Sequence, residues 1–575
     1  KNLSKIYGDG ENRVVALDHA NLKIVSSDFI SIMGPSGSGK STLLHLLSGL
    51  DKPSSGSLTY DGKDIYSYSD KELSAFRRKR IGFIFQQFNL LPVLTAKENI
   101  IMPLLLDKQK PDEAWKSLEK LRGVKLLPGN KVLLKRGEVF NGELEITGHG
   151  IPEDRIYIDA YGDGERKPCI VGYDTSLYAA RICNSDYITM QNLEIVNTGR
   201  QPLPYRSGLK IECMDYGVSQ NIVVNNVTVR DVNGSLVKEK GGGCGIYIVN
   251  GGEKKISTFN RLTIENCHIL RCTRNAMIWA AYSDRQNWHP SKHTVIRGNL
   301  IEEVPGDGIV PIGCDSTLIE YNVMRDCPDM LPDTEAAAGI WPWSCDNTLV
   351  QFNEVSGHKA PWDAQGFDSD WNCRGTVIQY NYSHDNYGGL VLVCNDGTAD
   401  ASFNVGNLGT IVRYNVSIGD GVRPEPTRAG MFSPAVHLAG PVKDSRITRN
   451  IIHVNRKPAA DIDRTMITLD SWGGYPDSTF ISGNIFYAPE SSRFQLTEST
   501  HNFFEGNYYL GRFEKLPEDG KACQSAEIYQ QEVLAKDENG YQGLALLMDT
   551  VEVTGVKGVF VNKEAIENFF SRLEK

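Results

Sequence analysis

The sequence contains no run of eighteen apolar residues, so it predicts no membrane-spanning helix. It also has no excess of basic residues, because 61 Lys and Arg stand against 71 Asp and Glu, for a formal net charge of −10. That balance argues against a nucleic-acid-binding surface and is compatible with a neutral polar ligand such as a sugar. No initiating Met and no apolar leader open the chain, so its beginning is expected to be cut.

Cysteine is missing before Cys169, and all 12 cysteines lie from there onward. The late cysteines show neither CxxC spacing nor paired histidines, so a zinc site is not expected. Cys267 and Cys272 are close enough in sequence to pair, and the sequence leaves that question open. At 575 residues the chain is too long for one ordinary core, so two or more domains are expected.

One phrase repeats through most of the chain. TLVQFN at 348–353 recurs as TVIQYN at 376–381. An Asn marks the same place in successive units, at spacings of 23 to 40 residues: Asn192, Asn226, Asn266, Asn299, Asn322, Asn353, Asn381, Asn415, Asn450, Asn484 and Asn507. Self-similarity at such a period, carried by short β-branched runs, is typical of a solenoid.

The units favour one kind of solenoid. Each offers two or three strands of four to six residues and no long amphipathic helical run, so successive coils must stack to bury their apolar faces. An Asn at the same bend of each coil can then form a hydrogen-bonded ladder. We therefore predict a mainly β fold, a right-handed parallel β-helix over 113–510. Leucine-rich repeats are excluded because the Leu-x-x-Leu-x-Leu phrase is missing, and a β-sandwich is the alternative.

The tail, residues 511–575, loses the repeated phrase. It ends in NKEAIENFFSRLEK, which has the pattern of an amphipathic helix. We expect this helix to cover the open edge of the last coil. Within the β-helix, Cys314, Cys345, Cys373 and Cys394 follow the same strand in successive coils and are expected to stack as small buried residues.

The first 112 residues carry a different signal. A short apolar run, Phe29–Met33, is expected to be a strand, and it is followed by GPSGSGKST at 34–42 and a helix-like LLHLLSGL. This is a phosphate-binding P-loop in its strand–loop–helix context. We expect backbone N–H groups of Gly37, Gly39 and Lys40 to cradle phosphate, the Lys40 amine to reach the β- and γ-oxygens, and Ser41 to bind Mg²⁺. The remaining predicted nucleotide contacts in the loop are Gly34, Ser36 and Thr42.

With Tyr7, GSLTYDGKDI at 56–65 and RRKRIGFIFQQFNLLPVLTAKENI at 77–100, residues 1–112 resemble the ABC transporter ATPases of the lipoprotein-releasing and macrolide-exporting type. The resemblance implies an α/β P-loop domain that binds ATP and Mg²⁺. It also implies that Tyr7 stacks on adenine and that Gln86 contacts Mg²⁺ and the attacking water. After Ile100, however, the sequence shows no LSGGQ signature, no apolar strand ending in Asp-Glu and no switch histidine. Because hydrolysis needs those groups, we expect weak nucleotide binding and no ATPase cycle.

The junction between the two parts has no Gly/Ser-rich linker. Residues 113–575 resemble the secreted right-handed β-helix proteins of polysaccharide-degrading bacteria, a group that holds glycoside hydrolases and polysaccharide lyases. Since an incomplete ATPase domain meets a β-helix without its leader, we interpret the join as an artificial fusion, with an evolved fusion as the alternative. The β-helix part is expected to be secreted or periplasmic, and the ATPase fragment cytoplasmic.

Catalytic residues are expected where side chains of neighbouring coils share an outer face. Aligning the strand after Gly in each coil places one set inside by period two: Ile309, Ile340, Phe367, Leu390, Val436 and Ile467. The first outward column then holds Val310, Trp341, Asp368, Val391 and His437, and the second holds Ile312, Trp343, Asp370, Val393 and Asp470. Two carboxylates and two tryptophans thus fall on neighbouring coils.

We predict that Asp368 and Asp370 form an acid/base pair, since alternate residues on a strand lie about 6.5 Å apart, within reach of the separation that suits a glycosidase. Like charges so close should raise one pKa, as a general acid requires. Trp341 and Trp343 offer stacking faces for sugar rings, with His437 and Asp470 beside them. Asp307 and His384 are further acid/base candidates. The alternatives are tryptophans buried under a loop, a Ca²⁺ site or solvated face at the Asp pair, and turn capping by His384 with Asp385.

Four functions follow from these residues, and the first is a glycoside hydrolase. The second is a polysaccharide lyase, which needs a basic residue and usually Ca²⁺; Lys359, Arg374 and Arg428 are available. The third is a non-catalytic glycan-binding solenoid. The fourth takes the N-terminal part literally, as a transporter ATP-binding subunit.

Overall fold

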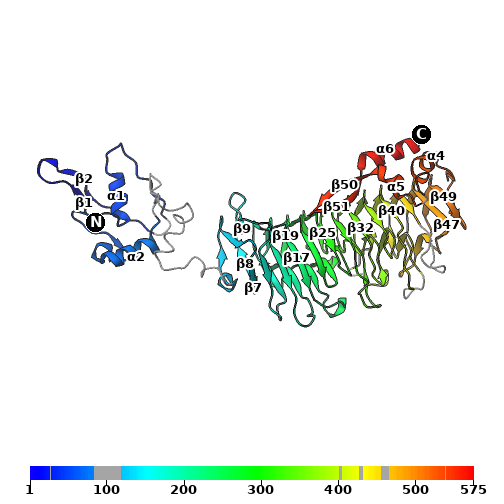
Figure 1. Ribbon diagram of the computed structural model, residues 1–575, viewed down its shortest axis with the longest axis horizontal. Coiled ribbons are helices and arrows are strands. Elements are labelled where there is room, and N and C mark those ends of the chain that lie inside the picture. Colours follow the sequence, from blue (N-terminus) through cyan, green and yellow to red (C-terminus); the bar gives the residue numbers. More distant parts are fainter. Residues whose placement is uncertain are drawn as a thin grey trace. The chain divides into compact units, whose positions relative to one another are not determined.

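The computed structural model describes residues 1–25, 28–82, 118–400, 404–426, 432–454, 465–537 and 539–574. The chain separates into two compact units, Lys1–Lys116 and Ser117–Lys575 (Figure 1). Residue Gln86 and the junction residues 105–117 lie outside the described residues, as does Arg428.

Up to residue 82, the described part of the N-terminal unit combines two hairpins with two helices. Strands β1 (Leu3–Tyr7) and β2 (Val14–Ala20) pair antiparallel, as do β3 (Thr59–Tyr60) and β4 (Lys63–Asp64). Two short 3-10 turns, η1 (Gly10–Asn12) and η2 (Ile65–Ser67), accompany helices α1 (Lys40–Leu47) and α2 (Asp70–Arg80). A capping box between Ser69 and Glu72 starts α2. The core is correspondingly small and includes Leu46, Ile65 and Leu73.

The predicted strand at 29–33 is absent, and that prediction is wrong. The segment is not assigned to any strand, and Phe29 and Met33 are 98% and 87% exposed. An isolated apolar segment does not hold a strand conformation without neighbours to accept its hydrogen bonds and cover its side chains. None of the described strands supplies that partner.

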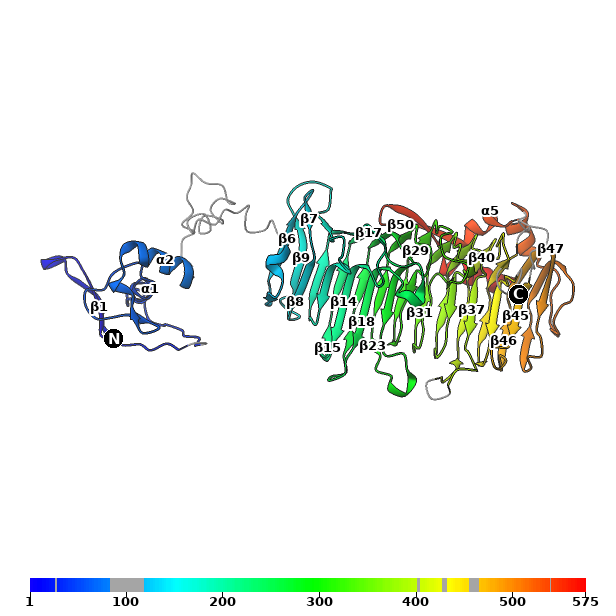
Figure 2. The same ribbon diagram turned by 90° about the horizontal axis from the view of Figure 1, so that it is seen from below.

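The C-terminal unit is a parallel β-helix, as predicted. Each full coil contributes a strand to each of three long sheets, and each strand pairs in parallel with its equivalent in the next coil. Figures 1 and 2 show the strands stacked along the length of this unit.

Sheet A carries the strand before the Asn bend: β6 (Lys131–Lys135), β9 (Ile156–Tyr161), β12 (Ile188–Gln191), β16 (Val223–Asn225), β20 (Thr263–Glu265), β24 (Val295–Arg297), β28 (Leu318–Glu320), β31 (Leu349–Gln351), β35 (Val377–Gln379), β39 (Ile411–Arg413), β43 (Arg446–Thr448), β46 (Thr479–Ser482) and β48 (Asn502–Glu505).

Sheet B carries the strand after it: β7 (Val139–Asn141), β10 (Cys169–Val171), β13 (Glu194–Asn197), β17 (Thr228–Val232), β21 (His268–Cys272), β25 (Leu300–Glu302), β29 (Val323–Arg325), β32 (Glu354–Ser356), β36 (Tyr382–His384), β40 (Val416–Ile418), β44 (Ile451–His453), β47 (Ile485–Gln495) and β49 (Tyr508–Phe513).

Sheet C follows a longer loop in each coil: β5 (Lys125–Leu126), β8 (Leu144–Gly148), β11 (Tyr178–Cys183), β14 (Ser207–Met214), β18 (Cys244–Gly251), β22 (Asn275–Ala280), β26 (Ile309–Val310), β34 (Phe367–Ser369), β37 (Val391–Cys394), β41 (Val436–Ala439) and β45 (Thr465–Asp470). Single parallel bridges from Ile309 to Ile340 and from Ile340 to Phe367 carry it across the middle coils.

Short strands fill the corners of the coils: β15 (Val218–Gln220), β19 (Thr258–Asn260), β23 (Ser291–Lys292), β27 (Cys314–Asp315), β30 (Ala336–Ala337), β33 (Trp362–Asp363), β38 (Asn407–Leu408) and β42 (Val442–Lys443). Three 3-10 turns complete this unit before its tail: η3 (Leu118–Leu121), η4 (Lys238–Lys240) and η5 (Arg285–Asn287).

The predicted Asn ladder is present from Asn299 to Asn507, with every member buried. In each step the Nδ2 group donates to the Oδ1 atom of the next Asn, for example from Asn353 to Asn381 at 3.0 Å. The backbone N–H makes the same contact at 2.9 Å, so each side chain also satisfies a buried amide.

The first three predicted members are placed one residue off. Asn192, Asn226 and Asn266 have positive φ values of 59°, 52° and 54° and precede the ladder position, which Cys267 occupies in the third of these coils. Asn tolerates the left-handed conformation as well as it forms ladders, so its sequence spacing alone does not separate the two roles.

In later coils this left-handed position is aromatic. Tyr321, Phe352, Tyr380 and Tyr414 have φ values of 52° to 55°. Their rings stack at centroid distances of 5.1, 5.2 and 5.4 Å. Bulky residues are rare in this conformation. Here their rings form one continuous aromatic surface, and another part of the chain covers it.

The covering part is the tail. It comprises α4 (Glu527–Tyr529), η6 (Gln530–Leu534), α5 (Tyr541–Leu544), η7 (Ala545–Leu547), β50 (Met548–Val553), β51 (Val556–Val561) and α6 (Lys563–Leu573). It runs lengthwise along the unit (orange to red in Figures 1 and 2). Phe560 meets Tyr321 and Phe570 meets Tyr414, both edge to face.

The predicted terminal helix is therefore present as α6, but its expected place is wrong. It packs on the flank of sheet B, where Tyr380 donates to Glu567, rather than over the open edge of the last coil alone. The outward apolar side chains of several coils, among them Val416 and Ile451, create a larger apolar surface there than one coil edge offers.

Candidate active site

Sheet C places the predicted carboxylates, with one change of register. Phe367 pairs with Val391, not with Leu390 as predicted, so Asp368 lies beside Leu392 rather than Val391, and His437 follows Leu392 in the next coil. The column of Asp370 continues through Cys394 and Asp470, and Val393 belongs to the adjacent row. The reason is the Gly388–Gly389 pair, which adds one residue before β37 relative to the single Gly366 before β34.

The same shift corrects the expected cysteine stack. Cys314, Cys345 and Cys373 are buried together, and the backbone N–H of Cys314 lies 3.3 Å from the Cys345 sulfur. Cys394 instead lies on β37, with its sulfur 3.1 Å from Asp370 Oδ1. All 12 thiols are free, including Cys267 and Cys272.

A cavity of about 290 Å³ opens over this face of sheet C. It brings together the predicted residues Asp307, Trp341, Trp343, Asp368 and Asp370. Further lining side chains are Lys238, Asp363, Trp371, Leu392, Cys394 and Trp472. Four carboxyl groups and four indoles thus surround one concave space, which we call the acidic cavity.

Asp307 is held in place on every side. Its Oδ1 accepts hydrogen bonds from the Trp341 indole and the Ala338 amide, both at 3.1 Å, and its Oδ2 pairs with Arg274 at 3.1 Å. With 1% of its surface exposed, Asp307 orients the Trp341 ring. The Lys238 amine lies 5.7 Å from the centroid of that ring.

Asp368 is the most enclosed carboxyl of the pair predicted from the sequence. It is 4% exposed, and its Oδ1 has no hydrogen-bond partner among the described residues. Burial raises the pKa of Asp368 well above its usual value, and the neighbouring carboxylates Asp363 and Asp370 raise it further.

Asp370 sits at the end of β34, where its Oδ1 accepts the Trp371 amide at 2.6 Å and lies 3.1 Å from the Cys394 sulfur. Burial raises the pKa of Asp370, whereas these two hydrogen bonds lower it and favour the ionised form. Asp370 is only partly buried, so its carboxylate borders the cavity.

Asp363 is the fourth carboxyl residue of the acidic cavity, and no pattern in the sequence pointed to it. It lies on β33, which pairs with β30 outside the three main sheets. Asp363 and Ala364 have φ values of 62° and 64°, a conformation that is strained for residues other than glycine. Burial, with Asp370 and Asp307 next in effect, raises the pKa of Asp363 to about 7.

A second cavity of about 100 Å³ adjoins the first, and Asp363 and Trp472 line both. The predicted residues His437 and Asp470 line this second cavity, together with Trp362, Gln365, Arg423 and Phe432. The His437 ring lies edge-on to Trp472, and its Nε2 is 3.6 Å from Asp470 Oδ2. Gln365 Oε1 is buried with no partner among the described residues.

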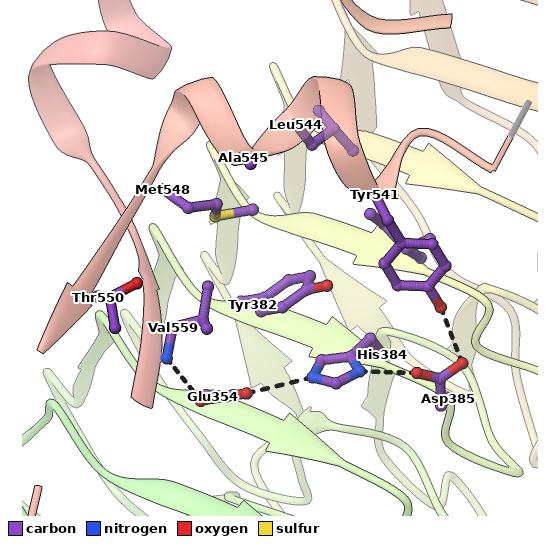
Figure 3. A pocket seen from close by; sticks show the side chains of 11 residues that line it. Glu354, Tyr382, His384, Asp385, Tyr541, Leu544, Ala545, Met548, Thr550 and Val559 are labelled. Carbon is purple, nitrogen blue, oxygen red and sulfur yellow. Dashed lines mark hydrogen bonds and ion pairs between the residues drawn. The ribbon is translucent and has the colours of Figure 1, made fainter. Parts of the chain in front are cut away.

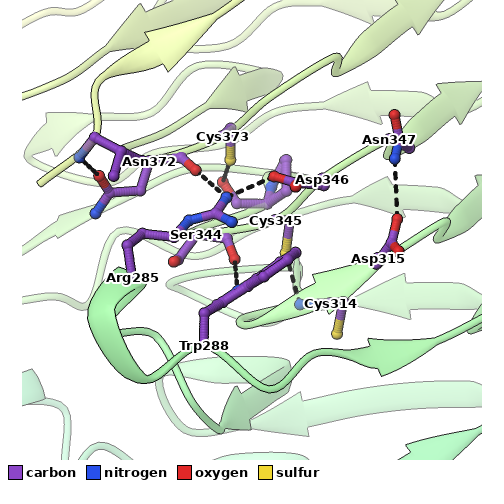
Figure 4. A network of polar contacts seen from close by, with 12 residues as sticks. Arg285, Trp288, Cys314, Asp315, Ser344, Cys345, Asp346, Asn347, Asn372 and Cys373 are labelled. Carbon is purple, nitrogen blue, oxygen red and sulfur yellow. Dashed lines mark hydrogen bonds and ion pairs between the residues drawn. The ribbon is translucent and has the colours of Figure 1, made fainter. Parts of the chain in front are cut away.

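A loop from the preceding coils supports the turn after Trp343 (Figure 4). The Trp288 indole donates to the Ser344 carbonyl at 2.9 Å, and Arg285 pairs with Asp346 at 2.7 Å and stacks 4.0 Å from the Trp288 ring. Arg285 also donates to the Asn372 carbonyl. Because these contacts tie neighbouring coils together, the turns that flank Trp343 and Asp370 are fixed from outside.

His384 does not join this site. It lies on β36 of sheet B and lines a cavity of about 390 Å³ between that sheet and the tail (Figure 3). Its Nε2 lies 3.2 Å from Glu354, its Nδ1 lies 2.8 Å from Asp385, and Asp385 accepts from the Tyr541 hydroxyl at 2.8 Å. The carboxylates outweigh burial and raise the pKa of His384 to about 9. His384, an acid/base candidate from the sequence, therefore does not line the acidic cavity, because its strand belongs to another sheet.

In the N-terminal unit, Gly39 with φ 84° precedes helix α1, and Gly37 has φ 83°. The Lys40 amine donates to the carbonyls of Gly34 and Pro35 at 2.7 Å. Ser36 lies in the same loop, and Ser41 and Thr42 lie in the first turn of α1. Tyr7, on β1, donates from its hydroxyl to Asp51 at 2.7 Å. The left-handed glycines, the lysine and the helix N-terminus fit a phosphate group.

Within the described ranges, no group of three or more His, Cys, Asp or Glu side chains is placed to hold a metal ion. The described helices also include none that is long and apolar enough to span a membrane.

Comparisons with known proteins match the two parts separately. Residues 17–140 match the ABC transporter family model, and residues 244–408 match the model of the right handed beta helix region. The first match runs past residue 117 into strands β5, β6 and β7 of the β-helix unit.

Among curated proteins, an uncharacterized ABC transporter ATP-binding protein of Methanocaldococcus jannaschii is 50% identical over 121 residues, which is 21% of this chain and 54% of that protein. The lipoprotein-releasing system ATP-binding protein LolD of Geobacter metallireducens is 43% identical over 141 residues, 24% of this chain and 62% of that protein. The chain thus spans little more than half the length of the curated relatives it matches.

Among solved structures, the GH136 lacto-N-biosidase of Eubacterium ramulus is 25% identical, with a TM-score of 0.48, over 61% of this chain and 63% of that one. An alginate lyase of Paenibacillus is 14% identical, with a TM-score of 0.36, over 60% of this chain and 92% of that one. The N-terminal part of this chain thus carries a portion of an ABC transporter ATP-binding domain, and the remainder is a right-handed parallel β-helix.

Proposed function

We propose that the β-helix part is a glycoside hydrolase that acts on a neutral oligosaccharide or polysaccharide at the acidic cavity. The observation that carries this proposal is the grouping of Asp363, Asp368 and Asp370 in a cavity walled by indole rings. Glycoside hydrolysis needs one protonated carboxyl and one carboxylate on opposite sides of the scissile bond. Indole faces bind the apolar C–H faces of sugar rings.

Within this group, Asp363 is the proton donor. Its pKa of about 7 keeps it mostly protonated below neutral pH, as a general acid requires, and its side chain is less enclosed than that of Asp368. Asp370 is the partner that works as a carboxylate: burial raises its pKa, and the Trp371 amide and the Cys394 thiol oppose that rise and favour its ionised form. Asp368, the acid expected from the sequence, stays neutral behind them, so it adds no further negative charge.

The substrate extends over both cavities, since Asp363 and Trp472 form their common wall. Trp341 and Trp343 line the acidic cavity, while Trp362, His437 and Asp470 line the smaller one. The unpaired Gln365 Oε1 accepts a sugar hydroxyl there. A substrate that carries acidic groups is disfavoured beside the Asp370 carboxylate, which lines the first cavity.

The test is hydrolysis of a panel of plant, algal and animal-type glycans by the protein and by three single variants, D363N, D368N and D370N. Asp444→Asn, in an exposed turn of sheet A, is the matched control. We expect a loss of turnover of 100-fold or more in D363N and D370N, about the size that acid–base groups contribute, with glycan binding retained. A smaller loss is expected in D368N.

Other outcomes would favour the other functions. Products with the absorbance of an unsaturated uronate would indicate a lyase, for which Lys238 is the one Lys or Arg among the described residues that lines the acidic cavity. Lys359 and Arg374 do not line it. Glycan binding with no turnover on any substrate would indicate a binding solenoid and refute the hydrolase. Stimulation by Ca²⁺ would support the lyase, since Ca²⁺ would neutralise a uronate.

The N-terminal part, in this proposal, binds a Mg²⁺–nucleotide through the P-loop and does not hydrolyse it. Lys40, Ser41 and the loop amides supply the phosphate contacts, and Tyr7 the adenine contact, whereas no signature or switch histidine follows in the sequence. The experiment is equilibrium binding of a fluorescent ATP analogue to the whole chain and to Lys40→Ala, with phosphate release measured in parallel. Repeated turnover of ATP, measured as phosphate release that Lys40→Ala abolishes, would show a working ATPase subunit instead.

The join of the two parts is proposed to be artificial, with the ATPase fragment from a cytoplasmic protein and the β-helix from a secreted or periplasmic one. Genomic DNA read across codons 105–120 tests this directly. An uninterrupted reading frame in the genome would establish a genuine fusion.

A further inference from the structure

The strained turn at Asp363 and Ala364 needs something to hold it. Both residues adopt positive φ values, which peptide sterics disfavour for side chains with a Cβ atom. Such a turn persists only where surrounding contacts over-determine it. Backbone pairing supplies part of the answer, because β33 is bound to β30 and the Ala364 amide donates to the Ala337 carbonyl at 2.8 Å.

The other part is Arg423, which reaches the turn from the loop after β40. Its Nη1 donates to the carbonyls of Ala360 and Pro361 at 2.9 and 2.6 Å, and its Nη2 donates to the carbonyl of Asp363 at 2.8 Å. One guanidinium group therefore binds three carbonyls within four consecutive residues. The planar fork of arginine suits this arrangement, whereas a lysine ammonium presents a single point of charge.

The Arg423 side chain is almost completely buried. It is 4% exposed, its guanidinium lies 6.0 Å from the centroid of the Tyr387 ring, and the partners described for it are backbone carbonyls. Its charge still acts on Asp363, because the attraction between the two lowers the pKa of that carboxyl against the effect of burial.

We infer that Arg423 is a positioning residue, which fixes the Asp363 carboxyl at the wall between the two cavities by clamping the carbonyls of 360–363. The inference rests on the proposed function only in taking Asp363 as the proton donor. Arg423 acts through the backbone of Asp363, so its loss changes the place and the ionisation of that carboxyl rather than a contact to the reacting atoms.

Two variants separate geometry from charge. Arg423→Lys keeps the charge and loses the three-carbonyl clamp, so kcat is expected to fall about 10-fold or more with little change in the pH profile. Arg423→Met loses both, so the alkaline limb of kcat/KM, which reports deprotonation of the acid, is expected to move to higher pH as well. Arg446→Lys, on β43 of sheet A and stacked on Phe480, is the matched control.

Tryptophan fluorescence tests the role of Arg423 without measuring hydrolysis. Trp362 adjoins Asp363 and Trp472 lines both cavities, so intrinsic tryptophan fluorescence is expected to titrate near pH 7 and to lose that transition in Asp363→Asn. In Arg423→Met the transition is expected to move to higher pH.

If the unmodified protein hydrolyses no glycan but its fluorescence transition moves to higher pH in folded Arg423→Met, the proposed function fails while the positioning role stands. Unchanged kcat in Arg423→Lys, or an unshifted fluorescence transition in folded Arg423→Met, would overturn the positioning role. If Arg423→Met does not fold, Arg423→Lys decides alone: wild-type kcat refutes the clamp, and reduced kcat with wild-type thermal unfolding supports it.

Discussion

The Cys394 thiol and the Asp370 carboxylate are hydrogen-bonded across neighbouring coils of sheet C, with Sγ 3.1 Å from Oδ1. The thiol is 2% exposed and packs with Trp371 and Trp472. It therefore orients Asp370 from the floor of the acidic cavity, and its hydrogen bond lowers the pKa of that carboxyl.

Replacing this donor should change the pH dependence of catalysis. In Cys394→Ala the pKa of Asp370 should rise, so the acidic limb of kcat/KM should move to higher pH and the rate near pH 5 should fall about 10-fold, the effect of one pKa unit. Cys394→Ser keeps a hydroxyl donor and is expected to restore the profile. Identical pH profiles for the Ala variant and the parent would show that the thiol does not act on Asp370.

Asp363 makes a second pH-dependent prediction, on stability. Its folded pKa of about 7 lies above the ordinary value near 4, so the unfolded chain releases this proton first as the pH rises. The contribution of Asp363 to the free energy of unfolding is therefore fully present below about pH 4 and is lost as the pH rises to about 7.

Asp363→Asn removes this dependence without changing the backbone. It should raise the free energy of unfolding of the β-helix by about 2 kcal/mol at pH 8 and by little at pH 4. Urea denaturation at the two pH values measures the difference, with Asp444→Asn as the exposed control. A variant that is destabilised at pH 8 would contradict the assignment of a raised pKa.

The fold was predictable because one residue type repeats at one bend. Asn353 and Asn381 each accept a neighbour's amide, and that chemical need recurs in the coils from Asn299 to Asn507. The exact register was not predictable where a residue suits two places. Asn226 takes the left-handed position one residue before the ladder, and Gly389 extends its coil by one residue, which moves Val391 rather than Leu390 opposite Phe367.

The candidate site shows the same division. Asp368 and Asp370 were found from strand periodicity, because side-chain direction alternates along a strand. Asp363 was missed because it lies on a corner strand whose two left-handed residues leave no periodic signal. His384 was misplaced because its distance from the Asp pair along the chain does not tell which sheet its strand joins.

His384 supports a prediction about the tail. Its ion pairs with Glu354 and Asp385 raise its folded pKa to about 9, above the ordinary value near 6.5. The resulting stability is fully present below about pH 6.5 and is lost as the pH rises through 9. Since Asp385 also accepts from Tyr541 and Glu354 from the Val559 amide, this cluster joins the tail to sheet B (Figure 3).

We therefore expect the tail to become accessible to proteases at pH 10 while the β-helix stays folded. His384→Gln should show the same accessibility at pH 7, with a loss of about 1 to 3 kcal/mol, as for a hydrogen-bonded partly buried charge. Tyr541→Phe, which removes one hydrogen bond to Asp385, should lose less. Cleavage within the tail followed by mass spectrometry measures this. Equal protection at pH 6 and pH 10 would refute it.

The Asn ladder gives the last prediction, which compares two asparagines of the repeat. Asn381 is buried, donates to Asn415 Oδ1 and the Val350 carbonyl at 3.0 Å, and accepts the Asn353 amide. Asn381→Ala would leave those buried groups without partners, so we expect a loss of about 3 kcal/mol in the free energy of unfolding. Asn226 occupies the exposed left-handed position, with φ 52°, where Gly fits equally well. Asn226→Gly should therefore cost well under about 1 kcal/mol. Urea denaturation of the two variants measures the contrast, and similar losses in both would show that the buried ladder does not stabilise the solenoid more than its surface turns do.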